Sequence, residues 1–107
     1  MKLGVLGLGI MGSAITANLI KAGHTVWGHD PRASARQKHA QSGGKACIKP
    51  SELISSCDVM LTSLPSPKAL QEVVDLLSEL AKPRTIVIET STLALDDKLA
   101  AHLQLKK

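Results

Sequence analysis

The chain alternates short apolar runs with longer segments in which apolar residues recur every three or four positions. Short apolar runs bounded by turn residues predict buried strands, and the wider spacing predicts helices that bury one face. Strands are expected at residues 2–6, 24–29, 45–48, 58–64 and 85–89. Helices are expected at residues 13–22, 33–41, 51–56, 67–81 and 96–103. This alternation predicts an α/β fold built on an open parallel sheet.

Right-handed crossovers between successive parallel strands give the strand order 3-2-1-4-5, with helices on both faces of a Rossmann-like sheet. The strand at 58–64 is apolar enough to be central. The strand at 85–89 would form an edge and leave Ile86, Val87 and Ile88 exposed on one margin. We therefore expect a second copy of the chain, or a partner chain, to cover that edge.

Composition agrees with one small globular domain. The chain has 107 residues, 44% of them hydrophobic, with one Trp and no Phe or Tyr, so its core must be aliphatic. The formal charge of +4 is spread over scattered basic residues, and stacking aromatics are missing, so nucleic-acid binding is not expected. Cys47 and Cys57 lack the spacing of metal ligands, and no metal site is predicted. They are expected to be reduced thiols in a cytoplasmic protein, because no secretory signal or membrane-spanning run is present.

A glycine-rich turn joins the first strand to the first helix, and its sequence is Gly7-Leu8-Gly9-Ile10-Met11-Gly12. Strand, glycine turn and helix in this order form the phosphate-binding half of a dinucleotide-binding unit. Gly7 allows a tight turn, Gly9 allows a diphosphate to approach the backbone, and Gly12 allows close packing of the helix. The helix start offers unpaired N–H groups to phosphate oxygens. The alternative is a glycine-rich turn that binds nothing.

An acidic residue, Asp30, follows the second strand, 18 residues after Gly12, where a carboxylate accepts hydrogen bonds from the adenosine ribose. Asp30 favours NAD because a carboxylate repels the 2′-phosphate of NADP. Arg32 opposes this preference, since its guanidinium could reach a 2′-phosphate. The expected cofactor is therefore NAD or NADP, with NAD slightly favoured.

Several segments together resemble the β-hydroxyacid dehydrogenases, such as 3-hydroxyisobutyrate dehydrogenase and 6-phosphogluconate dehydrogenase. The resemblance extends over nearly the whole chain and is carried by the glycine turn, Asn18-Leu19, Ala22-Gly23-His24, residues 62–67 (Thr-Ser-Leu-Pro-Ser-Pro) and residues 89–92 (Glu-Thr-Ser-Thr). Reductases of the pyrroline-carboxylate type start similarly, but the Leu-Pro and Ser-Thr segments favour the hydroxyacid group.

The resemblance implies that the glycine turn, Leu64, Pro65 and Thr92 contact NAD or NADP, and that Ser91 helps to hold a substrate carboxylate. Without the resemblance, Ser91 and Thr92 would be interpreted as a helix cap, and Leu64-Pro65 as a strand end. The family usually has Asp at the position of Glu89.

The family's catalytic lysine and helical C-terminal domain lie beyond the position equivalent to Lys107. We therefore expect residues 1–107 to be a partial, C-terminally truncated NAD(P)-binding Rossmann domain that binds cofactor without turnover. In the complete enzyme, hydride would move between the nicotinamide and a small 3-hydroxy acid. The alternatives are a non-catalytic dinucleotide-binding or interaction module and a truncated remnant.

Overall fold

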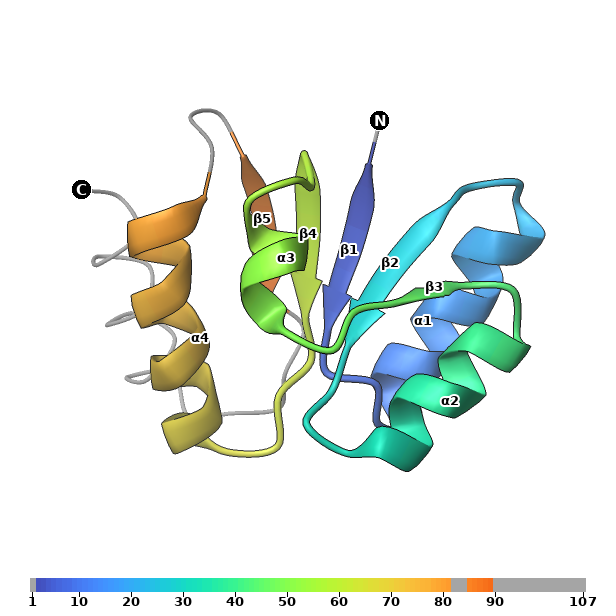
Figure 1. Cartoon of the computed structure of the whole chain (residues 1–107), viewed down its shortest axis with the longest axis horizontal. Coiled ribbons are helices and arrows are strands. Elements are labelled where there is room, and N and C mark those ends of the chain that lie inside the picture. Colours follow the sequence, from blue (N-terminus) through green and yellow to red (C-terminus); the bar gives the residue numbers. More distant parts are fainter. Residues whose placement is uncertain (1, 82–84, 90–107) are drawn as a thin grey trace.

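The computed structural model describes residues 2–81 and 85–89. The expected helix at 96–103 and the candidate residues Ser91 and Thr92 lie outside these ranges. The described elements, in chain order, are β1 (Leu3–Leu6), α1 (Ile10–Lys21), β2 (Val26–His29), α2 (Ala33–Gln41), β3 (Lys45–Ala46), α3 (Pro50–Ile54), β4 (Val59–Thr62), α4 (Pro67–Leu80) and β5 (Ile86–Glu89) (Figure 1).

The strands form one parallel sheet in the order β3-β2-β1-β4-β5, which confirms the predicted topology. β1 lies between β2 and β4, with Leu6 paired to His29 on one side and to Thr62 on the other. The carboxyl ends of these three strands therefore meet at one edge of the sheet. In this fold such a point, where the strand order reverses, is where ligands bind.

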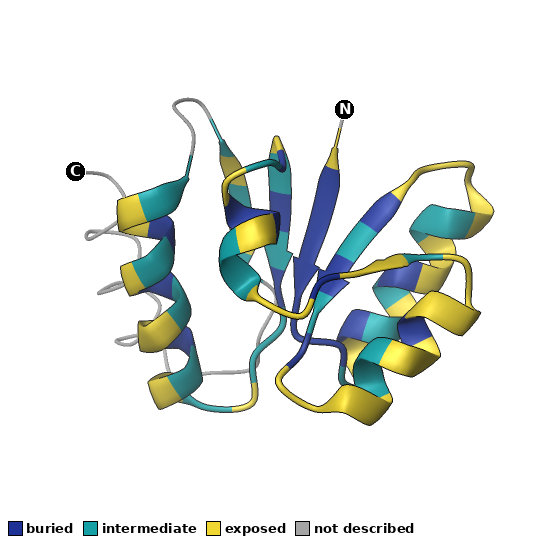
Figure 2. Cartoon of the chain, in the orientation of Figure 1, coloured by how far each residue is buried: buried dark blue, intermediate teal, exposed yellow. Residues whose placement is uncertain are grey.

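Helices cover both faces of the sheet, with α1 and α2 on one face and α3 and α4 on the other (Figure 1). Alternate residues of β1 point to opposite faces, so Val5 and Leu6 belong to different core clusters. Val5 packs with Leu8 and Val26 on the α1 side. Leu6 packs with a cluster that includes Leu53, Ile54, Met60 and Leu77 on the α3 and α4 side. Figure 2 shows that the dark blue, buried residues concentrate in β1 and on the inner faces of the helices.

Helix α4 begins and packs as its sequence predicts. Ser66 is the N-cap, and its hydroxyl oxygen accepts a hydrogen bond from the N–H of Ala69 at 3.1 Å. Pro67 occupies the first turn, where its missing N–H costs nothing. The buried residues Leu70, Val74 and Leu77 recur every three or four positions and face the sheet.

Several predicted element boundaries differ from the structure by one to three residues, and two of these differences have a clear cause. Helix α1 begins at Ile10, three residues earlier than the predicted start, because Gly9 is its N-cap. Half of the glycine turn therefore lies inside the helix. The predicted strand at 45–48 shortens to Lys45–Ala46, because β3 pairs only with Trp27 and Gly28 of β2 and Ile48 is exposed to solvent.

The two cysteines, Cys47 and Cys57, are buried and free. Burial raises the pKa of both thiols above the ordinary value. The thiolate is the reactive form of cysteine, so both side chains are expected to be chemically inert at neutral pH.

Strand β5 is at the edge of the described sheet, and its residues Ile86 and Ile88 are 57% and 45% exposed. Val87, which was also expected to be exposed, is half-buried and packs against the core cluster that contains Leu6. Association through this strand stays a prediction. Within the described residues, no helix combines the length and apolar character needed to cross a bilayer.

Candidate functional site

A cleft of about 750 Å³ opens at the carboxyl ends of β1, β2 and β4. It is bounded by the turn after each of these strands and by one side of α4. The lining residues are Leu6, Gly7, Gly9, Ile10, Met11, His29, Asp30, Pro31, Arg32, Pro50, Ser63, Leu64, Pro65, Ala69, Glu72, Val73 and Leu76. The three segments that the sequence predicted to converge therefore do meet at one site.

Gly7 forms the turn that leaves β1. Its φ is +100°, a conformation that side-chain-bearing residues rarely adopt. Its N–H donates to the carbonyl oxygen of His29 at 2.9 Å, and a Cβ at Gly7 would collide with the carbonyl oxygen of Ser63. The turn is thus enclosed between the ends of β2 and β4, and Gly7 is required by the fold itself.

Gly12 is buried in the first turn of α1, directly against Gly7 at the start of the glycine turn. A Cβ at Gly12 would collide with the carbonyl oxygen of Gly7 and lie 3.0 Å from its carbon. The start of α1 is also held by side chains: the hydroxyl of Ser13 donates to Leu8 O at 2.9 Å and that of Thr16 donates to Gly12 O at 2.7 Å. Gly12 therefore sets how closely the helix approaches the end of β1.

Gly9 has a different environment from Gly7 and Gly12. The nearest heavy atom to a Cβ added at Gly9 would be Nη2 of Arg32, at 3.9 Å. Its φ of −74° and ψ of −160° are open to any residue. The folded chain itself therefore does not require glycine here, and the space above Gly9 opens into the cleft.

The first turn of α1 presents backbone donors to this space. N–H groups at the start of a helix have no partner inside the helix, and they carry a partial positive charge. As the N-cap, Gly9 has no side chain to accept from them, and the first turn contains no acidic residue. The side chains of Ile10 and Met11 are 95% and 44% exposed. This arrangement suits an anion such as a phosphate.

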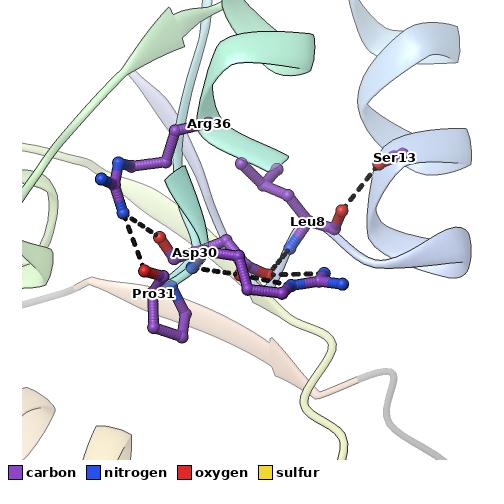
Figure 3. A network of polar contacts seen from close by, with 6 residues as sticks. Leu8, Ser13, Asp30, Pro31 and Arg36 are labelled. Atoms are coloured by element: carbon purple, nitrogen blue, oxygen red, sulfur yellow. Dashed lines mark hydrogen bonds and ion pairs between the residues drawn. The ribbon is translucent and has the colours of Figure 1, made fainter. Parts of the chain in front are cut away.

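Asp30 lies at the end of β2, is 5% exposed and accepts four hydrogen bonds (Figure 3). Its Oδ2 accepts from the N–H of Leu8 at 3.0 Å and from Nη2 of Arg32 at 3.2 Å. Its Oδ1 accepts from the N–H and from Nε of Arg32, both at 2.9 Å. The guanidinium of Arg36 donates to the carbonyl oxygens of Asp30 and Pro31 at 2.8 and 3.0 Å. Asp30 therefore links the glycine turn to the start of α2.

Two opposing effects act on the pKa of Asp30. Burial disfavours the charged carboxylate and would raise the pKa, but the hydrogen bonds from the Arg32 side chain and from the N–H groups of Arg32 and Leu8 lower it. The net result is a pKa below the ordinary value. Asp30 is therefore an anion at neutral pH.

This shift predicts a pH dependence of the free energy of unfolding. A carboxyl whose pKa is lower in the folded chain contributes stability above its unfolded pKa of about 3.9, and this contribution is lost as pH falls through the folded value. We expect the unfolding free energy of the wild type to fall more steeply below about pH 4 than that of Asp30→Asn. Urea denaturation between pH 2.5 and 7 measures both slopes, and parallel curves would contradict the prediction.

Two predicted contact residues, Leu64 and Pro65, follow β4 and line the cleft. The half-buried side chain of Leu64 packs against Leu70 and Val74 of α4, whereas Pro65 is exposed. At the end of β4, the hydroxyl of Thr62 donates to Oε2 of Glu89 at 2.7 Å. Glu89 thus links the ends of β4 and β5.

Most of the predicted site residues come together in the cleft, but Leu8 and Gly12 do not line it. Leu8 is 4% exposed in the core beside Val5, and its N–H is bonded to Asp30. One side of α4, formed by Ala69, Glu72, Val73 and Leu76, also lines the cleft and was not predicted. These four residues also recur every three or four positions, next to the core-facing residues of α4. This spacing places them on one side of the helix and could have predicted that they line the cleft.

The sequence matches the family described as "NAD binding domain of 6-phosphogluconate dehydrogenase" over residues 2–107. It is 34% identical over 97 residues to a probable 3-hydroxyisobutyrate dehydrogenase of Mycobacterium tuberculosis, a match that covers 91% of this chain and 33% of the relative. It is 36% identical over 98 residues to the cytokine-like nuclear factor N-PAC of Pongo abelii, covering 89% of this chain and 18% of that protein. The chain thus spans a third or less of the length of these relatives.

The structure is similar to that of Mycobacterium tuberculosis 3-hydroxyisobutyrate dehydrogenase with L-serine, with a TM-score of 0.94 and 31% identity over 98% of this chain and 36% of that one. Prephenate dehydrogenase from A. aeolicus, in complex with hydroxyphenyl propionate and NAD+, shares the fold alone, with a TM-score of 0.86 at 18% identity. The glycine turn, the open space at Gly9 and the family match lead to one conclusion: the chain belongs to the family of NAD-binding domains of the 6-phosphogluconate dehydrogenase type.

Proposed function

We propose that this chain binds a nicotinamide dinucleotide in the cleft, with the diphosphate against the backbone of Gly9, Ile10 and Met11. The observation that carries the proposal is the contrast among the three glycines. Gly7 and Gly12 are required by contacts within the protein, whereas the space at Gly9 is open and faces the unpaired donors of α1. A glycine that the fold does not need, at a helix N-terminus in a cleft, is explained by a ligand that must approach the backbone closely.

The other candidate residues lie on either side of the proposed diphosphate position. Asp30 and Arg32 form its adenosine end, and Leu64 and Pro65 lie along the side next to α4. A buried carboxylate suits the hydroxyls of a ribose better than a 2′-phosphate, which supports a modest preference for NAD over NADP. Thr92 near the nicotinamide and Ser91 at the substrate carboxylate remain proposals from the family resemblance, because both lie outside the described residues.

For the complete enzyme we propose hydride transfer between the nicotinamide and a small 3-hydroxy acid. Bound cofactor would supply the hydride chemistry, and this chain would bind and orient it. The proposal rests on the similarity to proteins named as 3-hydroxyisobutyrate dehydrogenases. This chain spans about a third of the length of those proteins, so the reaction is proposed for the complete enzyme. We also propose a cytoplasmic location.

A second candidate is a non-catalytic dinucleotide-binding or interaction module. It is favoured by the similarity to N-PAC, a protein named as a nuclear factor and not as a dehydrogenase. Both candidates share the same binding site. They differ in whether further residues complete a reaction.

Calorimetric titration with NAD and with NADP tests the proposed function. We expect one saturable site per chain for NAD and weaker binding of NADP, because Asp30 repels the 2′-phosphate. An increase in NADH absorbance on incubation with NAD and 3-hydroxyisobutyrate would favour the dehydrogenase over the non-catalytic module.

Two results would count against this account. Absence of heat with either nucleotide at millimolar concentration would refute the binding proposal. Tighter binding of NADP that is lost in Arg32→Ala would overturn the proposed preference for NAD.

A further inference from the structure

The adenosine end of the cleft is filled by a side chain of the protein itself. Nε and Nη2 of Arg32 donate to the two different oxygens of Asp30, at 2.9 and 3.2 Å. Nη2 of Arg32 also lies 3.9 Å from the position that a Cβ of Gly9 would take. The guanidinium therefore lies between Asp30, which follows β2, and Gly9 of the glycine turn.

The hydrogen bonds of Asp30 leave no acceptor position for a ligand. An ionised carboxylate offers about four acceptor positions, two on each oxygen. Backbone N–H groups of Leu8 and Arg32 take one position on each oxygen, and the guanidinium of Arg32 takes the other. Departure of the guanidinium would therefore free two acceptor positions, one on each oxygen. The two hydroxyls of a ribose need two acceptor positions.

Only one partner of this ion pair is free to move. The side chain of Asp30 is 7% exposed and that of Arg32 is 62% exposed. The backbone of this turn is held by Arg36 and by the start of α2, where Arg32 is the N-cap. The guanidinium can thus leave by rotation of its side chain alone, with the turn and the glycine loop unchanged.

We propose that the Arg32 guanidinium occupies the ribose position on Asp30 in the free chain and must leave Asp30 before NAD binds, so that Arg32 lowers NAD affinity. This inference rests on the proposed function. Because the guanidinium is exposed to solvent, the ion pair is weak, and the closed arrangement reduces the fraction of binding-competent chains by a small factor, about two to five.

Calorimetric titration of NAD into the wild type and Arg32→Ala tests the inference. We expect Arg32→Ala to bind NAD about two- to fivefold more tightly, since no ion pair has to open. The matched control is Lys38→Ala, which removes one exposed positive charge from the same helix outside the cleft lining. Loss of positive charge weakens attraction to an anionic diphosphate. Tighter binding by Arg32→Ala, with no such gain in Lys38→Ala, therefore cannot come from charge alone.

A second measurement follows the guanidinium directly. The Nε–H signal of Arg32 in ¹H–¹⁵N spectra should move on NAD addition toward the position typical of solvated arginines. Equal or weaker NAD binding by Arg32→Ala, or an Nε–H signal that stays unchanged at saturating NAD, would overturn the inference and leave the proposed function intact. Absence of NAD binding by the wild type and by both variants would overturn the proposed function as well.

Discussion

Gly9→Ala is expected to retain the fold and to weaken NAD binding by at least about tenfold, equivalent to about 1.4 kcal/mol. The added Cβ would meet nothing closer than 3.9 Å in the folded chain, so the protein has room for it. Two small effects on stability oppose each other. Alanine restricts the unfolded chain, which raises the free energy of unfolding by up to about 1 kcal/mol. It is also a poorer N-cap than glycine, which lowers the free energy of unfolding by a similar amount.

The loss should therefore appear only in binding, because the methyl group occupies the space that the diphosphate needs. Urea denaturation measures the first half of this prediction and calorimetric titration with NAD measures the second. The variant should unfold within about 1 kcal/mol of the wild type. Wild-type affinity in a folded Gly9→Ala would show that nothing approaches the backbone at this position.

Gly12→Ala, three residues further along the same turn, is expected to destabilise the fold by about 2 kcal/mol or more. Its Cβ would collide with the backbone of Gly7, which cannot move away because Gly7 is itself enclosed by Ser63. In a helix, alanine is normally favoured over glycine by about 1 kcal/mol, so the collision must outweigh this gain. Relief requires the start of α1 to shift away from β1.

The same urea denaturation measures this loss, and Gly9→Ala is the matched control because the substitution and the loop are the same. NAD binding by Gly12→Ala should also weaken, since the donors of the first turn move with the helix. A stability equal to that of the wild type would show that α1 does not pack against the glycine turn as closely as the structure indicates.

The sheet and its strand order could be predicted because the central strands and α4 have strong local signals. The apolar runs at β1 and β4, and the Ser66-Pro67 start of α4, are each visible in a few consecutive residues. The handedness of crossovers then leaves few possible arrangements. The convergence of the three turns followed from this topology.

The details that were not predicted depend on contacts between distant residues. The sequence pattern could not show that α1 begins at Ile10, because glycine is common both in turns and at the N-cap of a helix. The ion pair between Asp30 and Arg32 is local, but its position over Gly9 depends on the approach of two loops. Leu8 was predicted as a cofactor contact from its place in the motif, yet its side chain is needed by the core.

A titration of ¹⁵N-labelled chain with NAD, followed by ¹H–¹⁵N spectra, tests the binding site most directly. The amide signals of Gly9, Ile10 and Met11 should show the largest shifts and saturate together with one NAD per chain, because their N–H groups face the diphosphate. Signals of these three residues that stay unchanged at millimolar NAD, or shifts confined to other parts of the sheet, would contradict the account.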